Sequence, residues 1–408
     1  MYDCNIIKYQ SRKGKIEMLS KRINALSPSM TIAISTLAGE LKAQGKDILS
    51  FSAGEPDFDT PQRIKDAAAE AIEQGFTKYT PVAGIPELLD AIAGKLERDN
   101  GLKYDRQQII VSNGAKQSLF NLTQTLIDEG DEVIIPAPYW VTYPEIVKYA
   151  GGKPVIVDTK EHNGFKITPE QLEAAISDRT KLLIINSPSN PTGSVYTREE
   201  LEKIGEVLRG TKILVASDEM YEKLVFDGTE FTATASVSED MFQRTITING
   251  LSKSAAMTGW RMGYLACASK ELVSKMTALQ SQSTSNICSI VQRASIPALT
   301  GEIDEEIETM RSAFESRAHE AAELLNAIDG LSVLRPKGAF YLFVNIKDIT
   351  DDSMSFSKEL LAKYGVAVVP GIGFGSEGYF RFSYATNIVS IREGIRRIEK
   401  FVKEYRPS

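Results

Sequence analysis

The chain has few residues of the types that most often carry acid–base or metal chemistry. Its 408 residues include only two histidines and three cysteines. His162 stands in a polar turn and His319 in a charged helical stretch, so we interpret both as solvated bystanders. Cys4, Cys267 and Cys288 are odd in number and show no CxxC spacing. We therefore expect no histidine relay, no metal site and no disulfide scaffold, and the cysteine pattern is typical of a reducing, cytoplasmic compartment.

Long apolar runs and an excess of positive charge are also missing. No run approaches the roughly 18 apolar residues that span a bilayer, so we expect no membrane association. The formal net charge of −7 argues against nucleic acid as an electrostatic partner. The first seventeen residues contain several basic side chains but no apolar core of signal-peptide length. We expect residues 1–17 to form a disordered extension.

Short apolar strands alternate with helical stretches through most of the chain. This alternation predicts an α/β fold, with a mostly parallel sheet covered by helices on both faces. The helical stretches include residues 117–127, 141–150, 169–176 and 198–208. The strand-like runs are residues 108–111, 132–135, 154–157, 182–185, 213–216, 245–248 and 262–267.

After about residue 300 the pattern changes to a long charged helix at 302–328 and shorter strands. We expect these strands at residues 331–334, 341–344, 367–369 and 379–384, followed by a last helix at 388–405. Joined by an N-terminal helix at 32–43, these elements predict a smaller α+β unit. A chain of this length is typical of two domains.

Residues 373–378 match the dinucleotide-binding pattern GxGxxG but lack its structural context. That fingerprint requires a helix to open at its last glycine, where the pyrophosphate binds. Here residues 379–384 alternate like a strand instead. No GxxxxGK[ST] motif occurs in the chain either. We therefore expect no nucleotide site.

A single lysine follows the strand at 245–248, in a loop of small residues. Lys253 has serine and alanine neighbours, and Arg261 follows eight positions later. A partly desolvated amine near another cation has a lowered pKa and can form a Schiff base with an aldehyde. An arginine offers a planar fork that suits phosphate. Taken alone, the segment fits a surface loop with two ordinary cations equally well.

Other predicted strands end in polar loops, at the edge where sheets of this type bind ligands. Residues 112–117 form a small-residue turn before a helix, which suits an anion but also a plain βα turn. Asp218 ends a buried strand and needs a partner there, either the next loop or a protonated ligand nitrogen. Asn190 lies in a proline-rich loop that could be only a turn. Trp140 could stack on a flat ring or belong to the core.

The order of these motifs resembles that of the fold-type I pyridoxal-phosphate aminotransferases, and specifically the bacterial-type class I aspartate aminotransferase subgroup. The likeness runs from about residue 19 to residue 405. It rests on the motifs AGEPDFDTP at 53–61, KYTPVAGIPEL at 78–88, NSPSNPTG at 186–193, SDEMYE at 217–222, SK…TGWRMGY at 252–264 and RFSYA at 381–385.

The resemblance implies a homodimer with shared active sites. Each subunit would have a large domain, with a mostly parallel seven-stranded sheet, and a smaller α+β domain. Residues 18–60 would form an N-terminal arm and part of the small domain. Residues 61–300 would form the large cofactor-binding domain, and residues 301–408 the small C-terminal domain.

The resemblance also implies a role for each matched residue in a ping-pong reaction. Lys253 would carry pyridoxal 5′-phosphate covalently and move the proton. The residues implied in binding that cofactor are Gly114, Ala115, Lys116, Trp140, Asn190, Asp218, Tyr221, Lys253, Arg261 and, in the neighbouring site, Tyr79. Those implied in binding substrate are Gly54, Trp140, Asn190, Arg381, Lys116 and Thr31.

Two departures from the wider family bear on phosphate and substrate binding. Gly250 stands where many relatives have a phosphate-binding serine. Residues 280–286 lack the arginine with which the eukaryotic-type subgroup binds a distal carboxylate. In the bacterial-type subgroup, residues matching Lys116 and Thr31 take that role. The resemblance therefore implies aspartate or glutamate with oxaloacetate or 2-oxoglutarate, and leaves prephenate open as a further acceptor. The alternative is another specificity, such as for alanine or aromatic amino acids.

Overall fold

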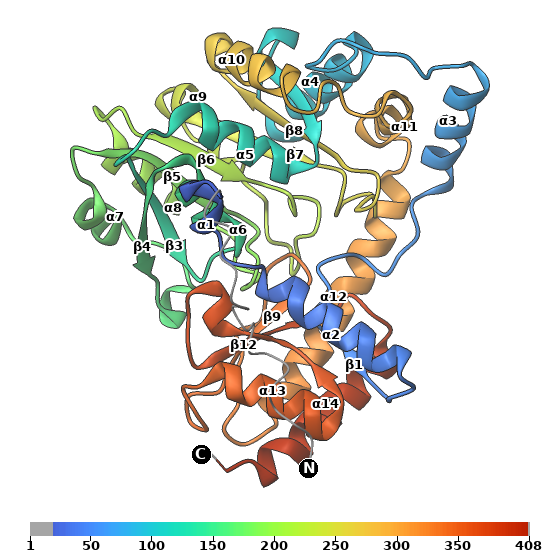
Figure 1. Cartoon of the computed structure of the whole chain (residues 1–408), viewed down its shortest axis with the longest axis vertical. Coiled ribbons are helices and arrows are strands. Elements are labelled where there is room, and N and C mark those ends of the chain that lie inside the picture. The colour runs from blue at the N-terminus through green and yellow to red at the C-terminus, as the bar shows by residue number, and fades with distance from the viewer. Residues whose placement is uncertain (1–18, 407–408) are drawn as a thin grey trace.

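The computed structural model describes residues 19–406, so the extension expected at residues 1–17 lies outside the described residues. A seven-stranded sheet lies at one end of the molecule and two small sheets lie at the other (Figure 1). Each of the seven predicted strands contributes one strand to the large sheet, which confirms the expected α/β fold. They are β2 Ile109–Asn113, β3 Glu132–Ala137, β4 Lys153–Asp158, β5 Thr180–Asn186, β6 Leu214–Asp218, β7 Thr245–Gly250 and β8 Met262–Cys267.

The sheet is mostly parallel, as expected. Its strand order is β2-β8-β7-β6-β5-β3-β4, and β8 pairs antiparallel with both of its neighbours. Because β8 runs against the other six strands, it begins at the edge where they end. The loops that follow β2, β3, β5, β6 and β7 therefore meet the segment before β8 at one edge of the sheet. Ligands bind at this edge in open α/β sheets.

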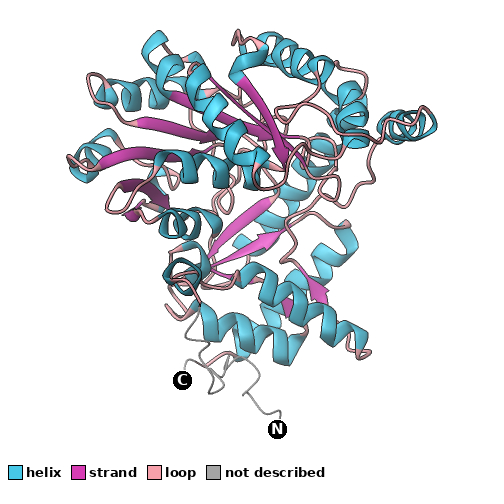
Figure 2. Ribbon diagram, turned by 45° about the horizontal axis from the view of Figure 1, so that its top comes forward, coloured by secondary structure: helices cyan, strands magenta, loops and turns pink. Residues whose placement is uncertain are grey.

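Successive side chains of these strands point to opposite faces, and both faces are buried. Val133 and Ile135 of β3 pack in one apolar cluster, while Ile134 packs in another on the other face. Both faces thus need a cover, and Figure 2 shows helices on either side of the sheet. Helices α5 Ala115–Leu126, α6 Thr142–Ala150 and α10 Lys270–Ser281 cover one face. The other face is covered by α4 Pro86–Asn100, α7 Pro169–Ala175, α8 Arg198–Leu208, α9 Glu239–Arg244 and α11 Ser289–Leu299.

Most of the remaining elements form the smaller part of the molecule, at the lower end of Figure 1. Strands β11 Val369–Pro370, β12 Tyr379–Ser383 and β9 Tyr341–Asn345 form an antiparallel sheet in that order. Strands β1 Leu49–Ser50 and β10 Val366–Ala367 form a parallel pair. The helices of this region are α2 Met30–Ala43, α12 Asp304–Asn326, α13 Ser353–Tyr364 and α14 Ile388–Glu404. The short helix α1 Lys21–Asn24 lies beside α6 of the large part, and α3 Gln62–Glu73 packs on α11. No helix within residues 19–406 is long and apolar enough to cross a membrane.

Two expected strands in this part differ in the structure. The strand expected at 331–334 is wrong, because the segment makes only a single bridge, from Ser332 to Asn345. The side chain of Asn326 accepts from the backbone N–H of Val333 and donates to its carbonyl, so those groups need no neighbouring strand. The strand expected at 367–369 is divided between β10 and β11, which belong to different sheets. As expected, residues 379–383 after the GxGxxG match form a strand, β12.

Candidate active site

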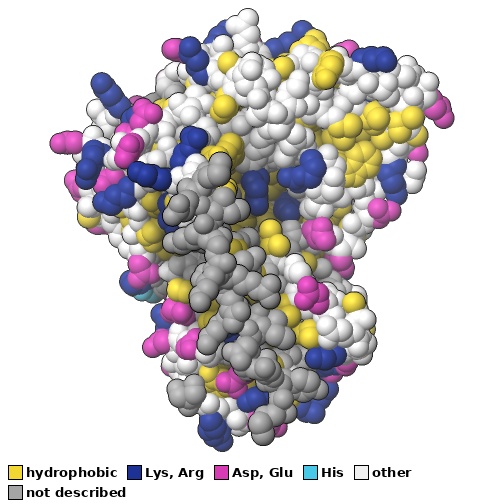
Figure 3. Space-filling view, in the orientation of Figure 1, with side chains coloured by type: hydrophobic (Ala, Val, Ile, Leu, Met, Phe, Trp, Pro, Cys, Tyr) yellow, Lys and Arg dark blue, Asp and Glu magenta, His cyan; other side chains and the backbone are white. Residues whose placement is uncertain are grey.

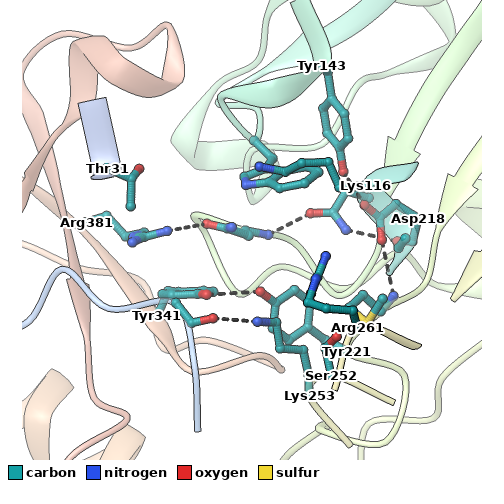
Figure 4. A pocket seen from close by; sticks show the side chains of 16 residues that line it. Thr31, Lys116, Tyr143, Asp218, Tyr221, Ser252, Lys253, Arg261, Tyr341 and Arg381 are labelled. Carbon is teal, nitrogen blue, oxygen red and sulfur yellow. Dashed lines mark hydrogen bonds between the residues drawn. The ribbon is translucent and has the colours of Figure 1, made fainter. Parts of the chain in front are cut away.

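A cavity of about 260 Å³ lies where the carboxyl edge of the large sheet faces the smaller part of the molecule. Lys and Arg side chains gather at this hollow in Figure 3, and Figure 4 shows the residues that line it. They come from ten separate stretches of the chain, and most of them have polar or charged side chains. The lining residues are Thr31, Gly54, Ala115, Lys116, Trp140, Tyr143, Asn186, Asn190, Asp218, Met220, Tyr221, Ser252, Lys253, Arg261, Tyr341 and Arg381.

Lys253 enters this cavity from the loop that follows β7. Its Nζ donates a hydrogen bond of 2.5 Å to the carbonyl oxygen of Gly54. Burial lowers the pKa of the amine to about 8, and the positive charges of Arg261 and Arg381 act in the same direction. A larger fraction of this amine is therefore uncharged near neutral pH than in an exposed lysine, as a nucleophile or general base requires.

Asp218 ends β6 at the floor of the cavity and is 5% exposed. The Tyr143 hydroxyl donates to its Oδ2 at 2.7 Å, and the Met220 N–H donates to its Oδ1 at 3.3 Å. Burial raises the pKa of this carboxyl to about 6, although both hydrogen bonds oppose the rise. No lysine or arginine within residues 19–406 forms an ion pair with it at salt-bridge distance. The carboxylate is thus suited to a positively charged partner in the cavity.

The first turn of α5 forms an anion-binding corner on the other side of Lys253. Its N-cap is Gly114, with φ of 77°, and no side chain of residues 19–406 caps its first N–H groups. Arg261 packs against this turn and donates from Nη2 to the carbonyl of Asn113 at 3.1 Å. A Cβ on Gly263 would lie 2.2 Å from the backbone nitrogen of Ala115, so only glycine lets β8 approach so closely. Free N–H groups, a helix dipole and a guanidinium together suit a phosphate.

Arg381 points into the cavity from β12 and is only 1% exposed. Its Nη1 donates to Asn190 Oδ1 at 2.9 Å, and its Nη2 donates to the Ser52 carbonyl at 2.7 Å. Its guanidinium lies 4.4 Å from the centre of the Tyr341 ring, and its Nε has no hydrogen-bond partner within residues 19–406. A buried arginine with an unused donor and no carboxylate is prepared for an anionic ligand.

A chain of hydrogen bonds connects Arg381 to the strand that carries Asp218 (Figure 4). Asn190, which accepts from Arg381, donates its backbone N–H to Asn186 Oδ1 at 2.8 Å. Asn186 in turn donates from Nδ2 to the carbonyl of Asp218 at 2.9 Å. These contacts fix the loop after β5. They therefore also fix the distance between the guanidinium of Arg381 and the carboxylate of Asp218.

The cavity contains all but two of the residues that the sequence singled out. Gly114 lies behind the guanidinium of Arg261, where a Cβ would meet Nη2 at 2.4 Å. Tyr79 lies outside the cavity and is 91% exposed. Lys116 and Thr31 both line it, and the Lys116 amine lies 5.0 Å from the centre of the Trp140 ring. Neither His162 nor His319 lines the cavity.

Sequence reasoning missed five lining residues: Tyr143, Asn186, Met220, Ser252 and Tyr341. Three of them lie inside or beside motifs that had been identified, so their proximity to Asp218, Asn190 or Lys253 was a usable signal. Tyr143 follows Trp140 by three positions, which places it one turn further at the start of α6. Tyr341 belongs to β9, and nothing in its sequence neighbourhood points to the cavity. Its hydroxyl lies 3.0 Å from that of Tyr221.

Comparison with known proteins agrees with this geometry. The chain is 50% identical over 392 residues to an aspartate aminotransferase from Bacillus sp. (strain YM-2), covering 95% of this chain and all of that protein. It is 50% identical over 395 residues to an aspartate/prephenate aminotransferase from Cereibacter sphaeroides, covering 94% and 98% of the two chains. The solved structure of the aspartate aminotransferase from Thermus thermophilus with maleate superposes with a TM-score of 0.90 at 44% identity, covering 94% of this chain and 99% of that chain.

A sequence model of one family covers most of the chain as well. The family described as aminotransferase class I and II matches residues 46–398, which include Lys253, Asp218 and Arg381. Together with relatives that are 50% identical over nearly their whole length, this match establishes homology. The chain belongs to the class I and II aminotransferases of fold type I.

Proposed function

We propose that this protein is an aspartate aminotransferase that uses pyridoxal 5′-phosphate. It would move an amino group between aspartate or glutamate and oxaloacetate or 2-oxoglutarate by a ping-pong mechanism. The fold-type I aminotransferase family is dependent on this cofactor. The observation that carries the proposal is one cavity with an amine of lowered pKa, a buried carboxylate and a buried arginine, of which the last two form no ion pair within residues 19–406.

The residues of the cavity fit pyridoxal phosphate group by group. The uncapped first turn of α5, with Arg261 and Ser252, would hold its phosphate, because these groups offer positive charge and hydrogen-bond donors. Asp218 would hold the protonated ring nitrogen, which supplies the cation that this carboxylate lacks. Trp140 would stack on the ring. When bound, the cofactor supplies an aldehyde for the amino group and a ring that withdraws electrons from the substrate's Cα.

The side chains of the protein then perform binding and proton transfer. Arg381 would bind the α-carboxylate of the amino acid with two parallel hydrogen bonds, and Asn190 helps to orient it. Lys253 would take the proton from the substrate's Cα in one half-reaction and return it to that carbon in the other, because burial lowers the pKa of its amine to about 8. The hydroxyls of Tyr221 and Tyr341 lie 3.0 Å from each other and line the same cavity as Arg381 and Lys253.

Lys116 and Thr31 support specificity for an acidic substrate. They reach the cavity from α5 and α2, on different sides of it (Figure 4). A cation and a hydroxyl in these positions would bind the distal carboxylate of aspartate. Burial against Trp140 and the charge of Arg261 lower the pKa of the Lys116 amine, so an added carboxylate would be a favourable partner. Prephenate is a further candidate acceptor, since the Cereibacter sphaeroides relative is named for both substrates.

A homodimer with shared sites completes the proposal. Tyr79 is the most exposed of the large apolar side chains described, and it does not line its own subunit's cavity. Apolar side chains also gather on the side of the molecule where α3 and α11 lie (Figure 3). In the proposed dimer Tyr79 donates its hydroxyl to the phosphate in the neighbouring site. We also keep the division at residues 18–60, 61–300 and 301–408, and the cytoplasmic location, as proposals.

The proposed function is tested by mixing purified enzyme with single amino acids and recording the absorbance of the bound cofactor through the half-reaction. Aspartate and glutamate should convert the cofactor rapidly, and alanine and the aromatic amino acids slowly. Oxaloacetate, 2-oxoglutarate and prephenate are then compared in the reverse half-reaction. Lys116→Ala serves as the specificity control, and its kcat/KM for aspartate should fall while that for alanine changes little. Conversion of alanine faster than aspartate by the unaltered enzyme would reject the substrate assignment.

A further inference from the structure

Tyr79 lies on a connection that is held at many points although its own side chain contacts solvent. We call residues 74–85, between α3 and α4, the Tyr79 loop. Ser289 donates its hydroxyl to the Phe76 carbonyl at 2.8 Å, and the Val111 N–H donates to the Ala83 carbonyl at 2.9 Å. Between these anchors the Tyr79 side chain is 91% exposed. The loop therefore presents an aromatic residue outward from a fixed backbone.

Gln292 of α11 forms the central anchor. It is fully buried, and both ends of its amide contact the loop. Its Oε1 accepts from the backbone N–H of Ile85 at 2.8 Å, while its Nε2 donates to the Thr80 hydroxyl at 2.8 Å and to the Ile287 carbonyl at 3.1 Å. The Thr80 contact holds the residue next to Tyr79. One side chain thus connects the middle of the loop to its end.

Gln280 of α10 forms a second anchor. It is the first residue of the segment 280–286, which contains no arginine. It too is fully buried. Its Nε2 donates to the carbonyls of Val82 and Val111 at 3.1 and 2.9 Å, and its Oε1 accepts from the Ser112 hydroxyl and the Asn121 amide. Val111 and Ser112 belong to β2, which leads to the first turn of α5. The same amide therefore connects the Tyr79 loop to the strand that leads to the anion-binding corner of its own subunit.

We propose that Gln280 and Gln292 are positioning residues, which fix the Tyr79 loop so that Tyr79 binds the cofactor phosphate in the site of a second copy of this chain. This inference rests on the proposed function. Ordering a loop at the moment of binding opposes binding, whereas a loop that is already fixed avoids that loss. The two buried amides fix it before the subunits meet. A defect in either anchor should accordingly appear in the partner's site.

The first test measures cofactor affinity in apoenzyme variants by fluorescence titration with pyridoxal phosphate. Thr80→Val removes the hydroxyl that accepts from Gln292 while keeping the size of the side chain, and Thr80→Ser keeps that hydroxyl. A neutral hydrogen bond contributes about a factor of three to ten. Thr80→Val should weaken cofactor binding by about this factor, with Thr80→Ser close to the unaltered protein. Equal affinity of all three proteins would overturn the role of Gln292.

The second test uses mixed dimers with one intact Lys253, in which borohydride fixes the cofactor on that lysine alone. In the first arrangement Gln292→Leu and Lys253→Ala are carried by different subunits. The only intact lysine is then served by Tyr79 from a subunit with an intact Gln292. In the second arrangement both changes are in one subunit, and the intact site depends on a Tyr79 whose anchor is lost. Thr80→Val replaces Gln292→Leu if the leucine variant does not fold.

Only the second arrangement should show weakened cofactor binding. Equal affinity, or an equal loss, in the two arrangements overturns the inference, because a loss of general stability does not depend on which subunit carries the change. Tyr79→Phe in the same two arrangements is the control for the dimer itself. If Tyr79→Phe shows the difference and Gln292→Leu does not, the positioning role fails while the shared site stands. If Tyr79→Phe shows none, the shared site and the inference both fail.

Discussion

Replacing Tyr143 by phenylalanine isolates one hydrogen bond at the centre of the site. The Tyr143 hydroxyl donates to Asp218 Oδ2 at 2.7 Å, and the two residues are 2% and 5% exposed. Phenylalanine keeps the ring and its edge contact with Trp140, whose centre lies 5.5 Å away. The perturbation therefore removes a donor from a buried carboxylate and leaves the packing nearly unchanged.

The size and sign of the effect follow from the chemistry of the pair. A hydrogen bond to a charged group contributes about 1.5–3 kcal/mol, and about 1.4 kcal/mol corresponds to one pKa unit. Since this bond stabilises the ionised form, it lowers the pKa of Asp218, which burial has raised to about 6. Its loss should raise that pKa further, by about one to two units. At pH 7 much of the carboxyl would then be protonated and unable to pair with a protonated ring nitrogen.

The assay is the dissociation constant of pyridoxal phosphate from apoenzyme, measured between pH 5 and pH 9. In the unaltered protein binding should weaken as pH falls through about 6, because Asp218 takes up a proton there. In Tyr143→Phe the same weakening should begin about one unit or more higher, and the two curves should converge near pH 9. Tyr139→Phe, which removes a hydroxyl from the same segment, should leave the curve in place. An identical pH dependence in Tyr143→Phe would show that the Tyr143 hydroxyl does not lower the pKa of Asp218.

Three further predictions concern other parts of the site. Because the pKa of Asp218 is raised from 3.8 to about 6, the unfavourable burial of its charge is absent below about pH 4 and complete above about pH 6. In urea unfolding, the free energy of unfolding of Asp218→Asn apoenzyme, compared with that of the unaltered apoenzyme, should therefore be up to about 3 kcal/mol higher at pH 8 than at pH 4. The cofactor affinity of the variant should fall. The same difference between the two proteins at both pH values would contradict this prediction. Arg381→Lys should raise the KM for aspartate by about tenfold to a hundredfold in steady-state assays, because an amine cannot bind the carboxylate through two parallel bonds; an unchanged KM would count against the proposed clamp. Gly250→Ser would place a Cβ 2.7 Å from the Met262 carbonyl oxygen and 2.9 Å from Gly263 Cα. We expect a loss of about 1–3 kcal/mol of stability in thermal unfolding and no gain in phosphate affinity, and tighter cofactor binding at unchanged stability would show that β7 and β8 can separate.

The large sheet could be predicted from the sequence because its strands are buried on both faces. Such strands are nearly continuous apolar runs, as in β3 and β5, and the polar residues that interrupt them mark the edge where ligands bind. The site residues at this edge, such as Asp218, directly follow those runs. Local pattern and function therefore coincide along this part of the chain.

The smaller part of the molecule was harder to predict, since its strands are short and their partners are distant in sequence. Leu49 pairs with Val366, and no local pattern encodes that choice. The segment containing Val333 is apolar enough for a strand, but the side chain of Asn326 takes its backbone hydrogen bonds. Tyr341 reaches the cavity only because β9 pairs with β12 there. These outcomes depend on tertiary contacts.

The central claim is that Lys253 carries the cofactor. Its most direct test is reduction of the purified holoenzyme with borohydride, followed by proteolysis and mass mapping of the lysine that keeps the pyridoxyl group. Lys253 and Lys116 are the two lysines that line the cavity, so the experiment distinguishes between them. We expect one pyridoxyl group per subunit, on Lys253, and none in Lys253→Ala. A pyridoxyl group on Lys116, or on a lysine outside the cavity, would contradict it.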